Sequence, residues 1–214
     1  MIRKHTVAAG LTAVVLAATS TVAAAPGAQA APSTSARAGT TSLAAVLASD
    51  GHRFDKKWGD FDILDAAVMA VLKEKPKSPV AVLADGKVRL TAFLPSDRAF
   101  RKLLKTLTGT APKTEKATFK AIASAAGIDV IETVLLYHVV PGKTLGAKKV
   151  VAADGKKLTT AQGGKVTVQV KGSKVTLVDA DPDVTDPMVV TTDINKGNRQ
   201  IAHAINRVLL PIDL

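Results

Sequence analysis

The side chains that could do chemistry are few, and two histidines are the first candidates. His138 lies three positions after Leu135 and four after Val134, so a helix would place it on an apolar stripe. His203 alternates with Ile201 and Ile205, so a strand would place all three on one face. A metal site would need both rings to converge with a carboxylate, which the spacing does not indicate. We therefore predict two buried, hydrogen-bonded histidines, no metal site and no cofactor.

The second candidate is the acidic run DADPDVTD, residues 179–186. Its aspartates, Asp179, Asp181, Asp183 and Asp186, alternate in the manner of the oxygen ligands of calcium loops. The match then fails, because the sixth loop position is Val184 instead of glycine and the twelfth is Val190 instead of glutamate. We predict an acidic, solvated turn, with weak calcium binding as the alternative.

Motifs for catalysis are missing from the sequence. The chain has no cysteine to act as a nucleophile, no nucleophile elbow and no paired-histidine helix motif. We predict a protein that is not an enzyme, and an extracytoplasmic hydrolase is the least favoured alternative.

The formal net charge of +11 comes mostly from scattered lysines. Nucleic-acid binding by stacking would need interleaved aromatic residues, but the chain has one Trp, one Tyr and five Phe. We therefore exclude nucleic acid as a partner. A basic domain of this kind suits an anionic wall polymer or an acidic polysaccharide as its partner better.

The N-terminal segment has the pattern of a secretory signal peptide. Arg3 and Lys4 precede an apolar stretch at 6–25, and Ala28-Gln29-Ala30 gives a small-x-small cleavage pattern. We predict a signal peptide at 1–30, a flexible linker at 31–41 and one domain at 42–214. Cleavage would lower the net charge from +11 to +9. No other stretch is long and apolar enough to span a bilayer, so we expect a secreted protein, held at a surface only by non-covalent contacts.

Helices are predicted first and strands second. Apolar residues at helical spacing follow Asp62, Ser96, Thr114 and Gly127, and Ser96 and Thr114 are candidate caps. Leu107 and Val130 lie on the apolar stripes. After Pro141 the pattern alternates, with a tight turn at Gly172-Ser173 and closing strands at 189–193 and 200–210. This order indicates an α+β fold.

Three stretches in order resemble the signatures of fasciclin-like domains: TAFLPSDRAF at 91–100, the Tyr137-His138 pair inside VLLYHVVPG, and IAHAINRVLLP at 201–211. The resemblance implies a β-sandwich or wedge with several packed helices, found in secreted and surface adhesion proteins. It implies a module that binds a cell-surface or matrix protein or polysaccharide, and nominates Tyr137 and His138 for partner recognition, although their spacing favours a structural role. The structural signature would comprise Phe93, Pro95, Ser96, Phe100, His203, Leu209 and Pro211.

Overall fold

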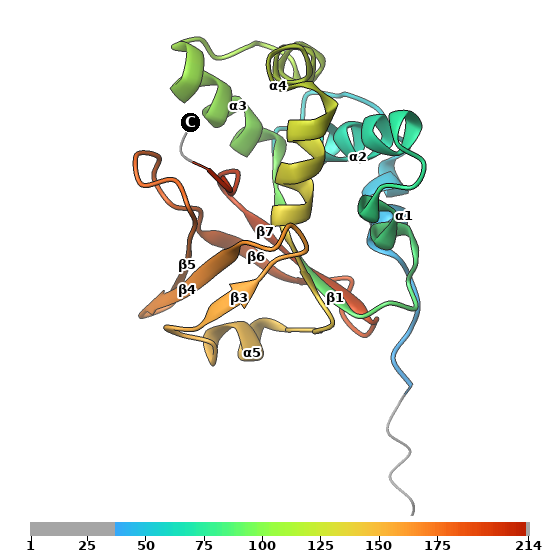
Figure 1. The fold of residues 1–214 in the computed structure, drawn as a ribbon, viewed down its shortest axis with the longest axis vertical. Coiled ribbons are helices and arrows are strands. Elements are labelled where there is room, and N and C mark those ends of the chain that lie inside the picture. Colours follow the sequence, from blue (N-terminus) through green and yellow to red (C-terminus); the bar gives the residue numbers. More distant parts are fainter. Residues whose placement is uncertain (1–36, 213–214) are drawn as a thin grey trace, which may run out of the picture. The chain divides into compact units, whose positions relative to one another are not determined.

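The computed structural model describes residues 37–212 (Figure 1). The predicted signal peptide and residues 31–36 of the predicted linker lie outside the described residues. The last part of that linker pairs with the loop before the final strand, because Gly39 N donates to Gly197 O at 2.8 Å and Arg199 N donates to Gly39 O at 3.0 Å. Ordered contacts with the domain therefore begin before residue 42, although the predicted boundary itself stays a prediction.

Helices dominate the first part of the described chain. They are α1 (Leu43–Leu47), the 3-10 helix η1 (Ala48–Asp50), α2 (Asp62–Glu74), the 3-10 helix η2 (Pro79–Ala84), α3 (Asp97–Thr108) and α4 (Glu115–Tyr137). Thr114 caps α4 as predicted, since its Oγ1 accepts from Ala117 N at 3.2 Å. The predicted break at Gly127 is present as a kink inside α4, where φ is 73° and ψ is 170°. None of the described helices is both long and apolar enough to cross a bilayer.

The predicted side-chain cap of α3 is wrong. Ser96 occupies the cap position, but its hydroxyl forms no capping hydrogen bond. The backbone carbonyl of Ser96 instead accepts from Ala99 N at 2.7 Å and from Phe100 N at 3.3 Å. Extended backbone at Ser96 therefore starts the helix without help from the hydroxyl.

Two sheets follow from the alternating segments. One has the strand order β2-β1-β7-β6, from β1 (Leu90–Pro95), β2 (Val139–Pro141), β6 (Val189–Ile194) and β7 (Gln200–Ile205). The other has the order β3-β4-β5, from β3 (Lys157–Thr159), β4 (Lys165–Lys171) and β5 (Lys174–Val178), and the predicted turn at Gly172-Ser173 joins β4 to β5. Strands β1 and β7 are parallel, although more than 100 residues separate them along the chain, and they form the centre of the first sheet.

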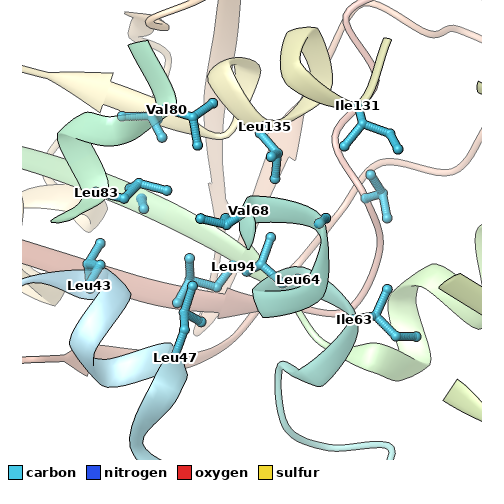
Figure 2. Close-up of a cluster of buried hydrophobic side chains, with 14 of the residues drawn as sticks. Leu43, Leu47, Ile63, Leu64, Val68, Val80, Leu83, Leu94, Ile131 and Leu135 are labelled. Atoms are coloured by element: carbon cyan, nitrogen blue, oxygen red, sulfur yellow. The ribbon is translucent and has the colours of Figure 1, made fainter. Parts of the chain in front are cut away.

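The four-stranded sheet is a middle layer with apolar side chains on both faces. Leu90, Ala92 and Leu94 of β1 join a core with α1 to α4, part of which is drawn in Figure 2. Phe93 of β1 and Ile205 of β7 join a second core with the three-stranded sheet. Figure 1 shows α1 to α4 on one side of the strands. The predicted α+β class is confirmed.

Two expectations for the second half are wrong. A short helix, α5 (Ala147–Val151), interrupts the part that alternation assigned to strands alone. The last strand ends at Ile205 instead of continuing to Leu210. Beyond it, Leu209 N donates to His138 Nε2 and Leu210 N donates to Asp179 Oδ2, so side chains replace a neighbouring strand as acceptors.

Candidate functional site

The three signature stretches meet inside the domain. Phe93 N, from the first, donates to the backbone oxygen of His138, from the second, at 2.9 Å. The rings of Phe93 and His203 lie 5.9 Å apart, centroid to centroid. Leu209 N, from the third stretch, donates to His138 Nε2 at 2.9 Å. The signatures therefore define the contacts that join the middle sheet, the end of α4 and the C-terminal segment.

Tyr137 and His138 are both buried at the end of α4, and they point into different cores. Tyr137 packs in the core between the sheets, and its hydroxyl donates to Lys165 O at 2.8 Å. Burial, followed by the nearby charge of Asp179, raises the pKa of Tyr137 to about 12. Burial lowers the pKa of His138 to about 4. Both side chains are therefore uncharged at neutral pH, and both form hydrogen bonds within the domain. Direct contact of Tyr137 and His138 with a partner protein stays a prediction.

His203 is fully buried on β7. Its Nε2 lies 2.7 Å from Leu145 O, and its Nδ1 accepts from Asp193 N at 3.4 Å. Burial lowers the pKa of His203. Within residues 37–212, neither His203 nor His138 joins a group of side chains spaced to hold a metal ion.

The remaining signature residues surround the same contacts. Phe93, Pro95, Phe100 and Leu209 are buried, whereas Ser96 and Pro211 are half-buried. Phe93 and Leu209 pack in the core that includes the three-stranded sheet, and Phe100 packs in the core with the helices. Their common role as a structural signature stays a prediction.

The acidic run at 179–186 is not simply a solvated turn, so that prediction is corrected. Asp181 is buried, and its Oδ1 accepts from Asp183 N at 2.9 Å and from Val184 N at 3.0 Å. Asp179 accepts from Leu210 N at 2.8 Å, and burial raises its pKa to about 6. The carboxylates bend the turn and tie it to the C-terminal segment through backbone donors.

Ser78 is a serine that lies beside a carboxylate. Its hydroxyl donates to Glu132 Oε1 at 2.5 Å and also accepts from Val80 N at 3.1 Å. Glu132 in turn pairs with Lys75, which together with the Ser78 hydrogen bond lowers the pKa of Glu132. A carboxylate with a lowered pKa is a weak base. This trio ties η2 and the end of α2 to α4, and it offers no activated nucleophile.

An apolar groove of about 370 Å³ lies between α3, α4 and the C-terminal segment. Its lining is almost wholly apolar, and includes Phe100, Leu103, Leu104, Leu107, Phe119, Ile122, Val130, Ile131, Val134, Val208, Leu210 and Ile212. Leu107 is 47% exposed and Val130 is 42% exposed, although helical spacing predicted that both would be inward. Their apolar stripes extend past the core onto the surface.

A second hollow, of about 360 Å³, is basic. Arg89, Lys143, Lys149 and Arg199 all line it. Arg199 is held in place because its guanidinium donates to Lys87 O at 2.9 Å. These four cations come from three segments, around residues 89, 143–149 and 199, so no single run in the sequence indicated the pocket. For the groove, the signal in the sequence was that the apolar stripes continue as far as Leu107 and Val130.

Comparison with known proteins identifies a family for the chain. A family model of the fasciclin domain matches residues 66–211. A solved FAS1 domain pair from the insect cell adhesion molecule fasciclin I is similar, with 19% sequence identity and a TM-score of 0.49 over 71% of this chain. The match covers 48% of that structure, so this chain spans about half the length of the domain pair. No curated protein matches the chain. With the fasciclin model covering most of its domain, the chain belongs to the fasciclin domain family.

Proposed function

We propose that this protein is a non-enzymatic adhesion module that binds a cell-surface or matrix protein through the apolar groove between α3 and α4. Fasciclin domains are commonly adhesion or cell-surface modules. The observation that carries the proposal is an open groove of about 370 Å³ with an almost wholly apolar lining. Exposed apolar surface of this kind marks sites of protein interaction.

The charge around the groove indicates the chemistry of the partner. Residues 97–128, which include α3 and the first half of α4, contain seven cations and two acids, Asp97 and Glu115. Both acids are fully buried, whereas Lys105, Lys116 and Lys120 are exposed. A partner that complements this face presents apolar side chains to the groove and acidic side chains to its surroundings.

The burial of Tyr137 and His138 favours this surface over the Tyr-His pair itself. Their side chains are 1% and 3% exposed, so a partner would have to open the domain to contact them. Their role in this proposal is to hold α4 against both cores. We place the module outside the cytoplasm, after removal of residues 1–30, on the charge and cleavage pattern of the N-terminal sequence.

The experiment compares adhesion of cells to surfaces coated with the wild-type protein and with a Leu107→Asp/Val130→Asp variant. Two charges that a bound partner would bury should weaken adhesion by about tenfold or more. Both positions are already about half exposed, so the variant should fold. Val151→Asp is the matched control, because Val151 is 48% exposed on α5 and is not part of the groove. Undiminished adhesion of the folded groove variant would reject the groove as the binding surface.

The second candidate function is binding of an anionic polysaccharide or wall polymer. The specific observation in its favour is the pocket lined by Arg89, Lys143, Lys149 and Arg199. Sulfate or carboxylate groups along a polymer would pair with these cations. This mode differs from the first in its dependence on salt.

A further inference from the structure

Acidic side chains gather where two helices, α2 and α4, begin. Asp62 is the first residue of α2 and Glu115 is the first residue of α4, while Asp55 and Asp60 come from the loop before α2. Each of these four offers a carboxylate oxygen, and the four oxygens all lie within 4.8 Å of one another. Like charges this close repel, so the arrangement favours either a bound proton or a cation.

Glu115 is the member that its protein surroundings leave unsatisfied. Its side chain is fully buried, and neither Oε1 nor Oε2 accepts a hydrogen bond of good geometry, because the neighbouring Asp55 N–H donates to Asp62 Oδ2 at 3.1 Å instead. Oδ1 of Asp60 is buried and unpartnered as well. Buried polar atoms without partners are rare and costly in folded proteins. Three such oxygens belong to two members of this one carboxylate cluster, which points to a ligand of opposite charge.

The charged neighbours of the cluster already have other roles. Asp97, the first residue of α3, accepts from Asp62 N at 3.2 Å and from Ile63 N at 2.8 Å, so it caps α2. Lys57 Nζ lies 3.0 Å from Asp55 Oδ2 on the outer side, where the Lys57 side chain is 78% exposed. The positive ends of α2 and α4 reduce the repulsion, but the Glu115 oxygens accept none of their N–H groups.

We propose that Asp55, Asp60, Asp62 and Glu115 bind a calcium ion. Calcium prefers oxygen ligands at 2.3–2.6 Å, so ligands on opposite sides of the ion lie up to about 5 Å apart, a span that accommodates this cluster. Magnesium would draw them to about 4 Å and demand octahedral geometry, which suits a cluster built from a loop and two helix ends less well. Asp55 is exposed and gives the ion a way in from solvent.

The chain carries its own reporter for the test. Trp58 is the only tryptophan and lies between Asp55 and Asp60 in the sequence, so it should sensitise the luminescence of terbium bound in place of calcium. We expect saturable terbium luminescence at one ion per chain, reversed by calcium. Calcium should also raise the melting temperature of the wild-type protein, and a chelator should cancel that rise.

Three variants decide the outcome. Glu115→Gln and Asp55→Asn should each weaken terbium and calcium binding by about tenfold or more, since even the loss of outer-shell partners costs that much. Without calcium, Glu115→Gln should melt higher than the wild type, because it removes a buried, unpartnered charge. Asp183→Asn, in the other acidic segment, is the control and should bind terbium as the wild type does.

The result that overturns the proposal is equally defined. The site is rejected if calcium changes neither luminescence nor melting temperature, or if the Asp55→Asn protein binds as tightly as the wild type. Loss of binding in Asp183→Asn with retention in Asp55→Asn would move the ion to the segment 179–186. Asp55 is exposed, so its variant keeps the test valid even if the buried Glu115→Gln variant fails to fold.

Discussion

His138 forms hydrogen bonds with three parts of the chain. Its backbone oxygen accepts from Phe93 N, its Nδ1 lies 2.7 Å from Val134 O, and its Nε2 lies 2.9 Å from Leu209 N. Because a carbonyl only accepts and a backbone N–H only donates, Nδ1 carries the proton and Nε2 is the acceptor. A second proton on Nε2 would face the Leu209 N–H, so the native contacts require the neutral ring.

We expect His138→Ala to lower the free energy of unfolding at pH 7 by about 1–3 kcal/mol, because it removes packing and leaves the Leu209 N–H without its acceptor. Denaturant titration measures the change. Thr133→Ala, on the outer side of the same helix, should change stability by no more than about 0.5 kcal/mol. An unchanged denaturant midpoint together with abolished partner binding would instead assign His138 to a binding surface.

The same residue should make the domain labile to acid. The folded pKa is about 4, below the ordinary value of 6.5, so the unfolded chain binds more protons between these two values. The contribution of His138 is therefore complete above pH 6.5 and is lost as the pH falls to 4. Burial raises the pKa of Asp179 to about 6, which acts in the opposite direction. The measurement is the free energy of unfolding of the wild type and of His138→Ala as a function of pH. The difference between the two should shrink from pH 7 to 4, and a constant difference would contradict the prediction.

At the scale of elements, the kink in α4 changes the direction of the helix, so that its two halves pack against different parts of the domain. Residues on both sides of Gly127 line the groove beside α3, and the half after it also carries Ile131 and Leu135 into the core and brings Tyr137 to the sheets. Figure 1 shows the two halves of α4 running in different directions. At Gly127, φ is 73° and ψ is 170°, a combination that is open to glycine and strained for other residues.

We expect Gly127→Ala to destabilise the domain by about 1–3 kcal/mol through backbone strain alone. A Cβ at this position would meet no atom within 4 Å, so a steric clash is not involved. Gly59→Ala is the matched control, because its added Cβ is equally free and its φ is not positive. Thermal or denaturant unfolding compares the two variants. Equal stability of both would show that the kink is not fixed by the glycine conformation.

At the scale of the whole molecule, positive charge has no single location. Exposed lysines lie around the groove, Lys171 and Lys174 lie at the β4–β5 hairpin, and the basic pocket collects four cations at another place. A net charge of +11, or +9 after removal of residues 1–30, attracts any polyanion at low salt. If binding depends on a local site, neutralising the cations of that site will weaken it more than neutralising the same number of cations elsewhere.

Binding to a sulfated polysaccharide should therefore be measured from about 50 to 500 mM salt, a range that shortens the screening length about threefold. We expect partial retention above about 150 mM if the basic pocket is a site, and Lys143→Gln/Lys149→Gln should remove the retained part. Lys171→Gln/Lys174→Gln carries the same change of charge and should retain it. Complete loss of binding at 150 mM in all three proteins would reduce the interaction to net charge and reject the pocket.

The sequence by itself determined the order of the elements and the family. Helical spacing after Asp62 and Thr114 located α2 and α4, Gly127 marked the kink, and alternation with Gly172-Ser173 located the β4–β5 hairpin. These features depend on local steric preferences and on periodicity, which act over a few neighbouring residues. The three signature stretches identified the fasciclin family for a related reason, since their residues make the contacts that join the layers.

Only the tertiary structure decided which apolar and acidic residues have partners. Leu107 and Val130 follow the same helical pattern as buried neighbours, but no element packs over them, so they line an open groove. The pocket around Arg89 and Arg199 joins residues that are far apart in the sequence. In the sequence, Asp62 and Glu115 each have the position of an ordinary acidic residue in the first turn of a helix, where the helix dipole stabilises a negative charge. That their two helices begin side by side, with Glu115 unpartnered, depends on long-range packing that no local pattern encodes.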